Sequence, residues 1–313
     1  MNDINIITDL IAEVSKGFIG KKDIVEDSLL AIFSDLHILI EDISGVGKTT
    51  LAKCIGKATG LSVGRIQFTP DLLPGDITGI SIWDPINRDF KLKKGSVFNE
   101  FIIADEINRS SPRTQSALLE AMEEKTVTID GTSYILPEPF FVFATKNPSY
   151  YLGTFDLPES QIDRFGVFLK PGYPKLEDEI NIIQTFKNIK PTQNINQITC
   201  KEKIIEIQNR VSNITIPESI MKYIVDIGNK TRTDTSIKFG ISTRGLQHLV
   251  KFSQAKAFIS NRDFLIPEDI MYSVKRVFPH KLILSSEAII NNISSEDIIK
   301  KILDSISIPI GIK

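Results

Sequence analysis

Residues 37–51 contain the residue types that bind phosphate. Three apolar residues lead into a loop with two glycines, and then come Lys48 and Thr49. Glycines let backbone N–H groups turn toward an anion, and the N-terminus of a following helix adds positive partial charge. In such a loop Lys48 reaches the β- and γ-phosphates and the Thr49 hydroxyl holds Mg²⁺. The expected phosphate-binding residues are Ser44, Gly45, Val46, Gly47, Lys48, Thr49 and Thr50.

Asp42 departs from the strict phosphate-loop pattern, which has glycine at this position. A carboxylate that pointed toward bound phosphate would repel it. The position comes just after a predicted strand, however, so the side chain can point away. A Gly-Lys-Thr loop can also be an ordinary turn, so the nucleotide-binding interpretation depends on the rest of the chain.

A second stretch with chemical potential is residues 101–106, an apolar run that ends in Asp105 and Glu106. The carboxyl end of a buried parallel strand is where α/β sheets bind ligands. With the phosphate loop upstream, Asp105 is predicted to hold Mg²⁺ and Glu106 to polarise an attacking water. Asn147 follows another apolar run, so it is expected at the same edge of the sheet, where it could orient the water or contact the γ-phosphate.

Two arginines are candidates for contacts with phosphate from outside the loop. Arg164 could pair with a local acid, or it could reach across a subunit interface to a neighbour's γ-phosphate, and spacing alone does not choose. Arg244 lies in the first turn of a predicted helix that Ser242 caps. A cation there opposes the helix dipole, which makes sense if both the helix end and Arg244 face an anion.

The expected elements place these residues on an α/β core. Amphipathic helices are predicted over residues 3–16 and 21–34, and Ile19 and Gly20 in the break between them are candidate adenine contacts or part of a plain turn. Residues 79–92 and 126–136 read as two hairpins inserted into the core. Trp83 on the first hairpin either grips a client or packs against the hairpin base.

After a Pro/Gly-rich linker at residues 171–175, the pattern becomes helical. We therefore expect two domains, a nucleotide-binding core over residues 1–171 and an all-helical lid over residues 172–313. The lid helices are expected over residues 176–187, 199–212, 217–231, 243–260, 267–277 and 295–305.

Composition narrows the class of protein. The 313 residues suit roughly two domains. A net charge of −2 gives no general attraction for nucleic acid. The sequence has no signal-peptide pattern and no apolar run near the roughly 20 residues that cross a bilayer, so a cytoplasmic location is expected. Cys54 and Cys200 form no CxxC motif, and Cys54 is expected to be a small core residue.

Together these motifs resemble those of MoxR-family AAA+ ATPases over nearly the whole chain. The segments that carry the resemblance are IEDISGVGKTTLAK (40–53), FTPDLLPGDITG (68–79), ADEINRSSPRTQSALLEAMEE (104–124), FFVFATKNP (140–148), GTFDLPESQIDRF (153–165) and ISTRGLQHLVK (241–251).

The resemblance implies an αβα P-loop domain with a parallel central sheet, a helical lid and assembly into a ring, usually hexameric. It also implies ATP and Mg²⁺ as cofactors and a client-facing or pore-facing position for both hairpins. The implied roles are Walker A for Lys48 and Thr49, Walker B for Asp105 and Glu106, sensor 1 for Asn147, arginine finger in trans for Arg164, and sensor 2 for Arg244.

The family often works with separately encoded von Willebrand factor A domain proteins, so the resemblance implies ATP-driven remodelling of a protein partner. Three alternatives remain open at this point. They are the motor of a chelatase-type metal insertase, a nucleic-acid-associated ring ATPase, which the mixed charge of residues 79–92 disfavours, and a scaffold that binds nucleotide without hydrolysing it.

Overall fold

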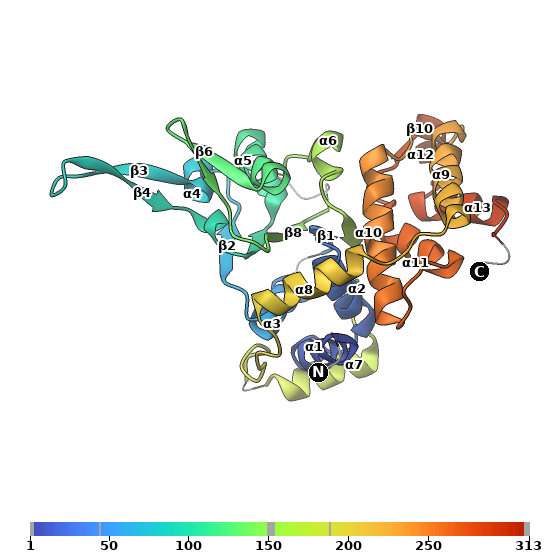
Figure 1. Cartoon of the computed structure of the whole chain (residues 1–313), viewed down its shortest axis with the longest axis horizontal. Helices are drawn as coiled ribbons and strands as arrows, with labels where there is room; N and C mark the ends of the chain where they lie inside the picture. Colours follow the sequence, from blue (N-terminus) through green and yellow to red (C-terminus); the bar gives the residue numbers. More distant parts are fainter. Residues whose placement is uncertain (1–2, 44, 149–153, 188, 310–313) are drawn as a thin grey trace.

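The computed structural model describes residues 3–43, 45–148, 154–187 and 189–309. They form a three-layer core, with helices on both faces of a parallel sheet, and a helical lid beside it (Figure 1). The lid helices from residue 218 onward lie at one end of the molecule, and a two-stranded ribbon projects from the opposite end (Figure 1). The predicted αβα core followed by a lid is confirmed.

The central sheet has five parallel strands in the spatial order β2-β5-β8-β1-β9. Their bounds are β1 (Ile38–Glu41), β2 (Val63–Gln67), β5 (Phe101–Asp105), β8 (Phe141–Lys146) and β9 (Val167–Leu169). The three central strands are apolar runs with both faces covered, which is typical of parallel sheets. Because the strands are parallel, their carboxyl ends meet at one edge.

Alternate strand residues pack into different layers. Ile38 and Ile40 join a core cluster with the helices α1 (Asp3–Gly17), α2 (Lys22–Phe33) and α3 (Lys48–Thr59). Leu39 faces the other way and packs into the cluster of α5 (Pro112–Glu124). This alternation is the period of two that a pleated strand imposes. Cys54 is buried in the first cluster, as expected for a core residue, and burial raises its pKa to about 11.

The edge strand β9 was not predicted from the sequence, because three residues are too few to show a period. It pairs with β1 through the register Ile38↔Val167. This pairing fixes the chain just after Arg164 and Phe165 beside β1.

Both predicted hairpins are present. The first consists of β3 (Gly79–Asp84) and β4 (Asp89–Lys94), and the second of β6 (Thr126–Ile129) and β7 (Thr132–Ile135). The core also contains short helices, which are α4 (Pro74–Thr78), η1 (Ser96–Phe98), η2 (Ile107–Arg109) and α6 (Glu159–Ile162). Trp83 is half-exposed and meets its cross-strand partner Phe90 edge to face, with ring centroids 5.3 Å apart.

The predicted lid helices are all present, with ends within a few residues of those expected. They are α7 (Leu176–Thr185), α8 (Lys201–Ser212), α9 (Glu218–Thr233), α10 (Thr243–Ile259), α11 (Pro267–Val277) and α13 (Ser295–Ser305). The sequence did not predict the short helix α12 (Ser286–Ile290) or the two-stranded pair β10 (Ile237–Phe239) and β11 (Ile283–Leu284).

A buried ion pair attaches the lid to α2. Asp27 accepts hydrogen bonds from the Tyr272 hydroxyl at 2.6 Å and from Arg276 Nε at 3.0 Å. The Arg276 guanidinium lies 3.8 Å from the centre of the Tyr272 ring. Glu26 pairs with Lys256 of α10 at 2.6 Å. These contacts hold α10 and α11 against the core at a distance from the phosphate loop.

Within the described ranges, no helix is both long and apolar enough to cross a membrane.

Candidate functional site

The loop after β1 surrounds the amino group of Lys48. Gly45 and Gly47 have φ values of 92° and 86°, which glycine adopts without steric cost. The helix α3 begins at Lys48, so the unpaired N–H groups of its first turn lie at the loop. Lys48 Nζ donates to the carbonyl oxygen of Asp42 and lies 3.4 Å from Asn147 Oδ1. Burial lowers the pKa of Lys48, against the opposing effect of nearby carboxylates. Ser44 lies outside the described residues.

The Asp42 carboxylate is held by backbone N–H groups and does not line the cavity that contains Lys48 and Thr49. Its Oδ1 accepts the N–H of Ile43 at 2.8 Å, and its Oδ2 accepts the N–H of Gly172 in the linker to the lid. Asp42, the residue that departs from the strict loop pattern, therefore joins the phosphate loop to the linker at Gly172.

Asp105 and Thr49 face each other across the loop. Thr49 Oγ1 donates to Asp105 Oδ1 at 2.8 Å. The other carboxylate oxygen, Oδ2, accepts from Arg65 Nε at 2.8 Å. Arg65 belongs to β2, which pairs with β5 in the sheet. Its position at the site was missed because spacing along the sequence does not show which strands become neighbours.

Glu106 is the residue next to Asp105, but its side chain has different partners. Its Oε1 accepts from Asn147 Nδ2 at 3.1 Å and its Oε2 from Arg109 Nη1 at 2.9 Å. Burial acts to raise the Glu106 pKa, but these hydrogen bonds and the charges of Arg109 and Lys48 outweigh it, so the pKa lies below its ordinary value. The side chain is therefore ionised near neutral pH. The backbone of Glu106 is left-handed, with φ of 57°, a conformation that costs energy and is found at functional sites.

These side chains line one polar cavity of about 310 Å³ at the carboxyl edge of the sheet. It combines a lysine and helix N–H groups on one side with carboxylates on the other, which suits a charged substrate bound with a cation. The lining residues are Gly45, Gly47, Lys48, Thr49, Thr50, Arg65, Gln67, Asp105, Glu106, Thr145 and Asn147.

A second cavity of about 400 Å³ adjoins the other side of the loop. It shares Gly45, Gly47 and Thr50 with the polar cavity, also contains Val46, and is otherwise mainly apolar. Ile19 lines it, as do the α7 residues Ile182 and Ile183. Its lining suits a flat apolar group such as a nucleotide base.

Gly20 does not line that cavity. It has φ of 84°, and a Cβ there would lie 2.3 Å from Asp178 Cγ, so glycine lets the turn pass under α7. The structure thus brings Ile19, but not Gly20, to the cavity where a base would bind.

The polar cavity fits Mg²⁺ and a nucleotide phosphate chain. The Thr49 hydroxyl and the Asp105 carboxylate are oxygen ligands of the kind that Mg²⁺ prefers. A Cβ at Gly45 would meet nothing within 4 Å, so the loop has open space for phosphate. The described residues include no group of three or more His, Cys, Asp or Glu side chains that could hold a metal ion. One carboxylate with phosphate oxygens is the usual Mg²⁺ environment in ATPases.

Sequence comparison identifies the family. Residues 37–167 match the model of the ATPase family associated with various cellular activities (AAA), and residues 229–302 match the AAA lid domain. The Chaperone MoxR1 of Mycobacterium tuberculosis is 33% identical over 98% of this chain and 83% of its own length. The chain belongs to the MoxR family of AAA+ ATPases.

Two other proteins are similar to this chain over nearly its whole length. The uncharacterized protein YeaC of Bacillus subtilis is 42% identical over 96% of this chain and 94% of its own length. A crystal structure from Cytophaga hutchinsonii, described as that of a candidate ATPase, matches with a TM-score of 0.91 and 39% identity. It covers 98% of this chain and 96% of its own chain.

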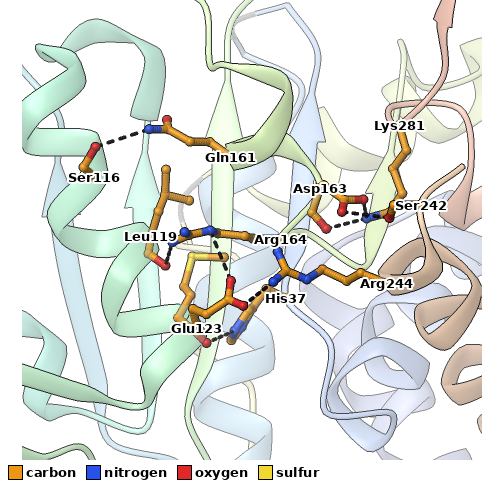
Figure 2. A network of polar contacts seen from close by, with 11 residues as sticks. His37, Ser116, Leu119, Glu123, Gln161, Asp163, Arg164, Ser242, Arg244 and Lys281 are labelled. Atoms are coloured by element: carbon orange, nitrogen blue, oxygen red, sulfur yellow. Dashed lines mark hydrogen bonds and ion pairs between the residues drawn. The ribbon is translucent and has the colours of Figure 1, made fainter. Parts of the chain in front are cut away.

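The two arginines suggested by the MoxR resemblance lie outside the polar cavity. Arg164 and Arg244 line a separate cavity of about 180 Å³ between α5 and α10. Both contact Glu123 of α5 (Figure 2). Glu123 Oε2 lies 3.2 Å from Arg164 Nε, and Glu123 Oε1 pairs with Arg244 Nη2. Arg164 also donates to the carbonyl oxygen of Leu119. The anion expected near Arg244 is, in this conformation, the chain's own Glu123.

Glu123 was not singled out in the sequence, because a glutamate near the end of a helix has the pattern of a solvated surface residue. Ser242 caps α10 as expected, since its hydroxyl accepts the N–H of Gly245 at 3.0 Å.

Proposed function

We propose that this MoxR-family chain hydrolyses ATP at interfaces between subunits of a hexameric ring, and uses the cycle to remodel a separate protein partner. The geometry of the polar cavity supports ATP as substrate, and the family supports the ring and the chaperone-like role. In this proposal residues 1–171 are the nucleotide-binding core and residues 172–313 the lid. A von Willebrand factor A domain protein is the proposed partner, by resemblance to other family members.

Five residues of the polar cavity have a defined part in the proposed reaction. Lys48 neutralises charge on the β- and γ-phosphates. Thr49 and Asp105 would hold Mg²⁺, which supplies further neutralisation of the phosphate chain. Glu106, ionised and held by Asn147, orients the attacking water and accepts its proton. Positioning and electrostatic stabilisation therefore carry the chemistry.

One observation supports hydrolysis in trans. Arg164 and Arg244 lie together in a cavity that shares no lining residue with the polar cavity of the same chain. Within the described residues, the polar cavity of one chain therefore lacks Arg164 and Arg244, and these two arginines converge on Glu123 elsewhere on the same chain. Placing the arginines of one subunit against the ATP of the next completes the site, and a head-to-tail contact of this kind gives a ring when the rotation between subunits closes.

Mixing two variants tests this arrangement. Glu106→Gln lacks the base but keeps Arg164, and Arg164→Ala lacks the finger but keeps the base. Each alone should hydrolyse ATP slowly, because Glu106→Gln lacks the base at every site and Arg164→Ala lacks the finger, which supplies roughly 10³–10⁵ in rate. Their equal mixture should recover activity at roughly a quarter of all sites, where a subunit with the base has a neighbour with the finger.

The controls are nucleotide binding and particle size. Both variants should bind ATP and form rings like the wild type, and wild-type specific activity should rise with protein concentration. Wild-type hydrolysis by Arg164→Ala alone, or a mixture no more active than its components, would refute the assignment in trans.

A further inference from the structure

The segment that carries Arg164 is tied to the lid of its own chain. Asp163 precedes Arg164 and contacts two lid residues. Lys281 Nζ donates to the Asp163 carbonyl oxygen at 2.6 Å and to Asp163 Oδ1 at 3.1 Å. The Ser242 hydroxyl donates to Asp163 Oδ2 at 2.9 Å. Figure 2 shows Lys281 and Ser242 meeting Asp163 from the lid side.

The residue after Arg164 is also held by the lid. The Phe165 carbonyl oxygen lies 2.9 Å from His280 Nε2. The Arg164 side chain itself is joined to Arg244 of the lid through Glu123. Asp163 and Phe165 thus contact the lid directly, and Arg164 between them is connected to it through Glu123.

Among these lid residues, Lys281 is a buried cation, and it makes two hydrogen bonds to Asp163. Its side chain is 1% exposed. A buried ammonium group is costly unless it is paired, and Asp163 is the carboxylate that pairs with it. Its third neighbour is His248 Nδ1, at 3.2 Å. Burial lowers the pKa of both Lys281 and His248. The histidine is therefore neutral and can accept a hydrogen bond from the ammonium group.

The lid does not depend on Lys281 for its attachment to the core. The contacts of Asp27 with Tyr272 and Arg276, and of Glu26 with Lys256, join the lid to α2 independently. Removing the Lys281 charge therefore removes the buried cation that pairs with Asp163, while the lid stays attached to the core.

We propose that Lys281 is a positioning residue for ATP hydrolysis in the neighbouring subunit: through Asp163 it makes the lid of each subunit set the placement of Arg164. This inference rests on the proposed hydrolysis in trans. It predicts which subunit is affected: a change at Lys281 acts on the active site of the neighbour that receives Arg164, and not on the active site of its own chain.

The mixed-ring assay can separate these two sites. In one mixture Lys281→Met is added to the finger donor, which carries Glu106→Gln. In the other it is added to the finger acceptor, which carries Arg164→Ala. The donor combination should lose about 10- to 100-fold in kcat, as expected for a reacting group that is misplaced by about 1 Å, with KM for ATP unchanged. The acceptor combination should match the mixture without the lysine change.

A matched control is Lys222→Met, which removes a lysine from an exposed lid pair with Glu218. It should change neither mixture. Ser242→Ala in the donor removes another contact of Asp163 and should give a smaller loss with the same dependence on the donor. This variant also covers the case in which Lys281→Met does not fold.

Equal losses from Lys281→Met in donor and acceptor would overturn the inference, since a general structural role acts on both subunits alike. No loss in either would also overturn it. If the mixture without any lysine change shows no recovery, hydrolysis in trans itself fails, and that result differs from the other two.

Discussion

The charge of Asp42 provides a quantitative test of the loop geometry. If its carboxylate faced the phosphate chain at about 4 Å, the repulsion would be about 4 kcal/mol per unit charge at an effective dielectric constant of about 20. Replacing it with asparagine would then tighten nucleotide binding by roughly three powers of ten.

The structure predicts a much smaller effect. Both carboxylate oxygens accept backbone N–H groups, from Ile43 and from Gly172, and Asp42 does not line the phosphate cavity. The carboxylate does attract Lys48, and losing that attraction leaves the ammonium group freer to bind phosphate. We therefore expect Asp42→Asn to tighten ADP binding by less than about 10-fold.

Isothermal titration calorimetry with ADP at fixed ionic strength measures this difference. Glu41→Gln is the matched control, because it removes the same charge one residue earlier, where the carboxylate pairs with Lys146 at 2.6 Å. A gain of about 100-fold or more in Asp42→Asn alone would contradict the observed orientation.

Three further predictions concern the lid and the base cavity. Asp27→Ala leaves Arg276 without its buried partner and should lower the unfolding free energy, measured in urea, by about 3–5 kcal/mol, whereas Glu218→Ala, which breaks an exposed pair with Lys222, should leave it nearly unchanged. Burial lowers the pKa of Lys281 from 10.5 to about 8, so between these values only the unfolded chain binds the proton. The unfolding free energy of the wild type should therefore rise over this pH range relative to Lys281→Met. Ile183→Ala should weaken ADP binding about 5-fold, through lost apolar contact, and leave tripolyphosphate binding unchanged in calorimetry.

The parts of the fold that the sequence predicted are those with strong local signals. The apolar runs that form β1, β5 and β8 are continuous because both of their faces are buried, and the lid helices show clear amphipathic periods. The short strands β9, β10 and β11 escaped prediction because two or three residues have no period.

The site was predictable where its residues follow one another along the chain. The phosphate loop and the Asp105–Glu106 pair are of this kind. Arg65 and Glu123 are not, because their roles come from strand pairing and from packing of the lid. Lys281 shows the same limit, since nothing in its local sequence distinguishes a buried lysine from an exposed one.

The exposed ribbon of β3 and β4 offers a way to detect a protein partner by hydrogen exchange. It has only two strands, and large apolar side chains are exposed on it: Ile80, Ile82, Trp83, Ile86 and Phe90. A two-stranded ribbon without a buried face is only marginally stable, so its amide hydrogens should exchange with solvent far faster than those of the central sheet. A protein that covered the ribbon would slow that exchange locally. Hydrogen–deuterium exchange over residues 79–94 is thus a reporter of docking that needs no label and no knowledge of the partner.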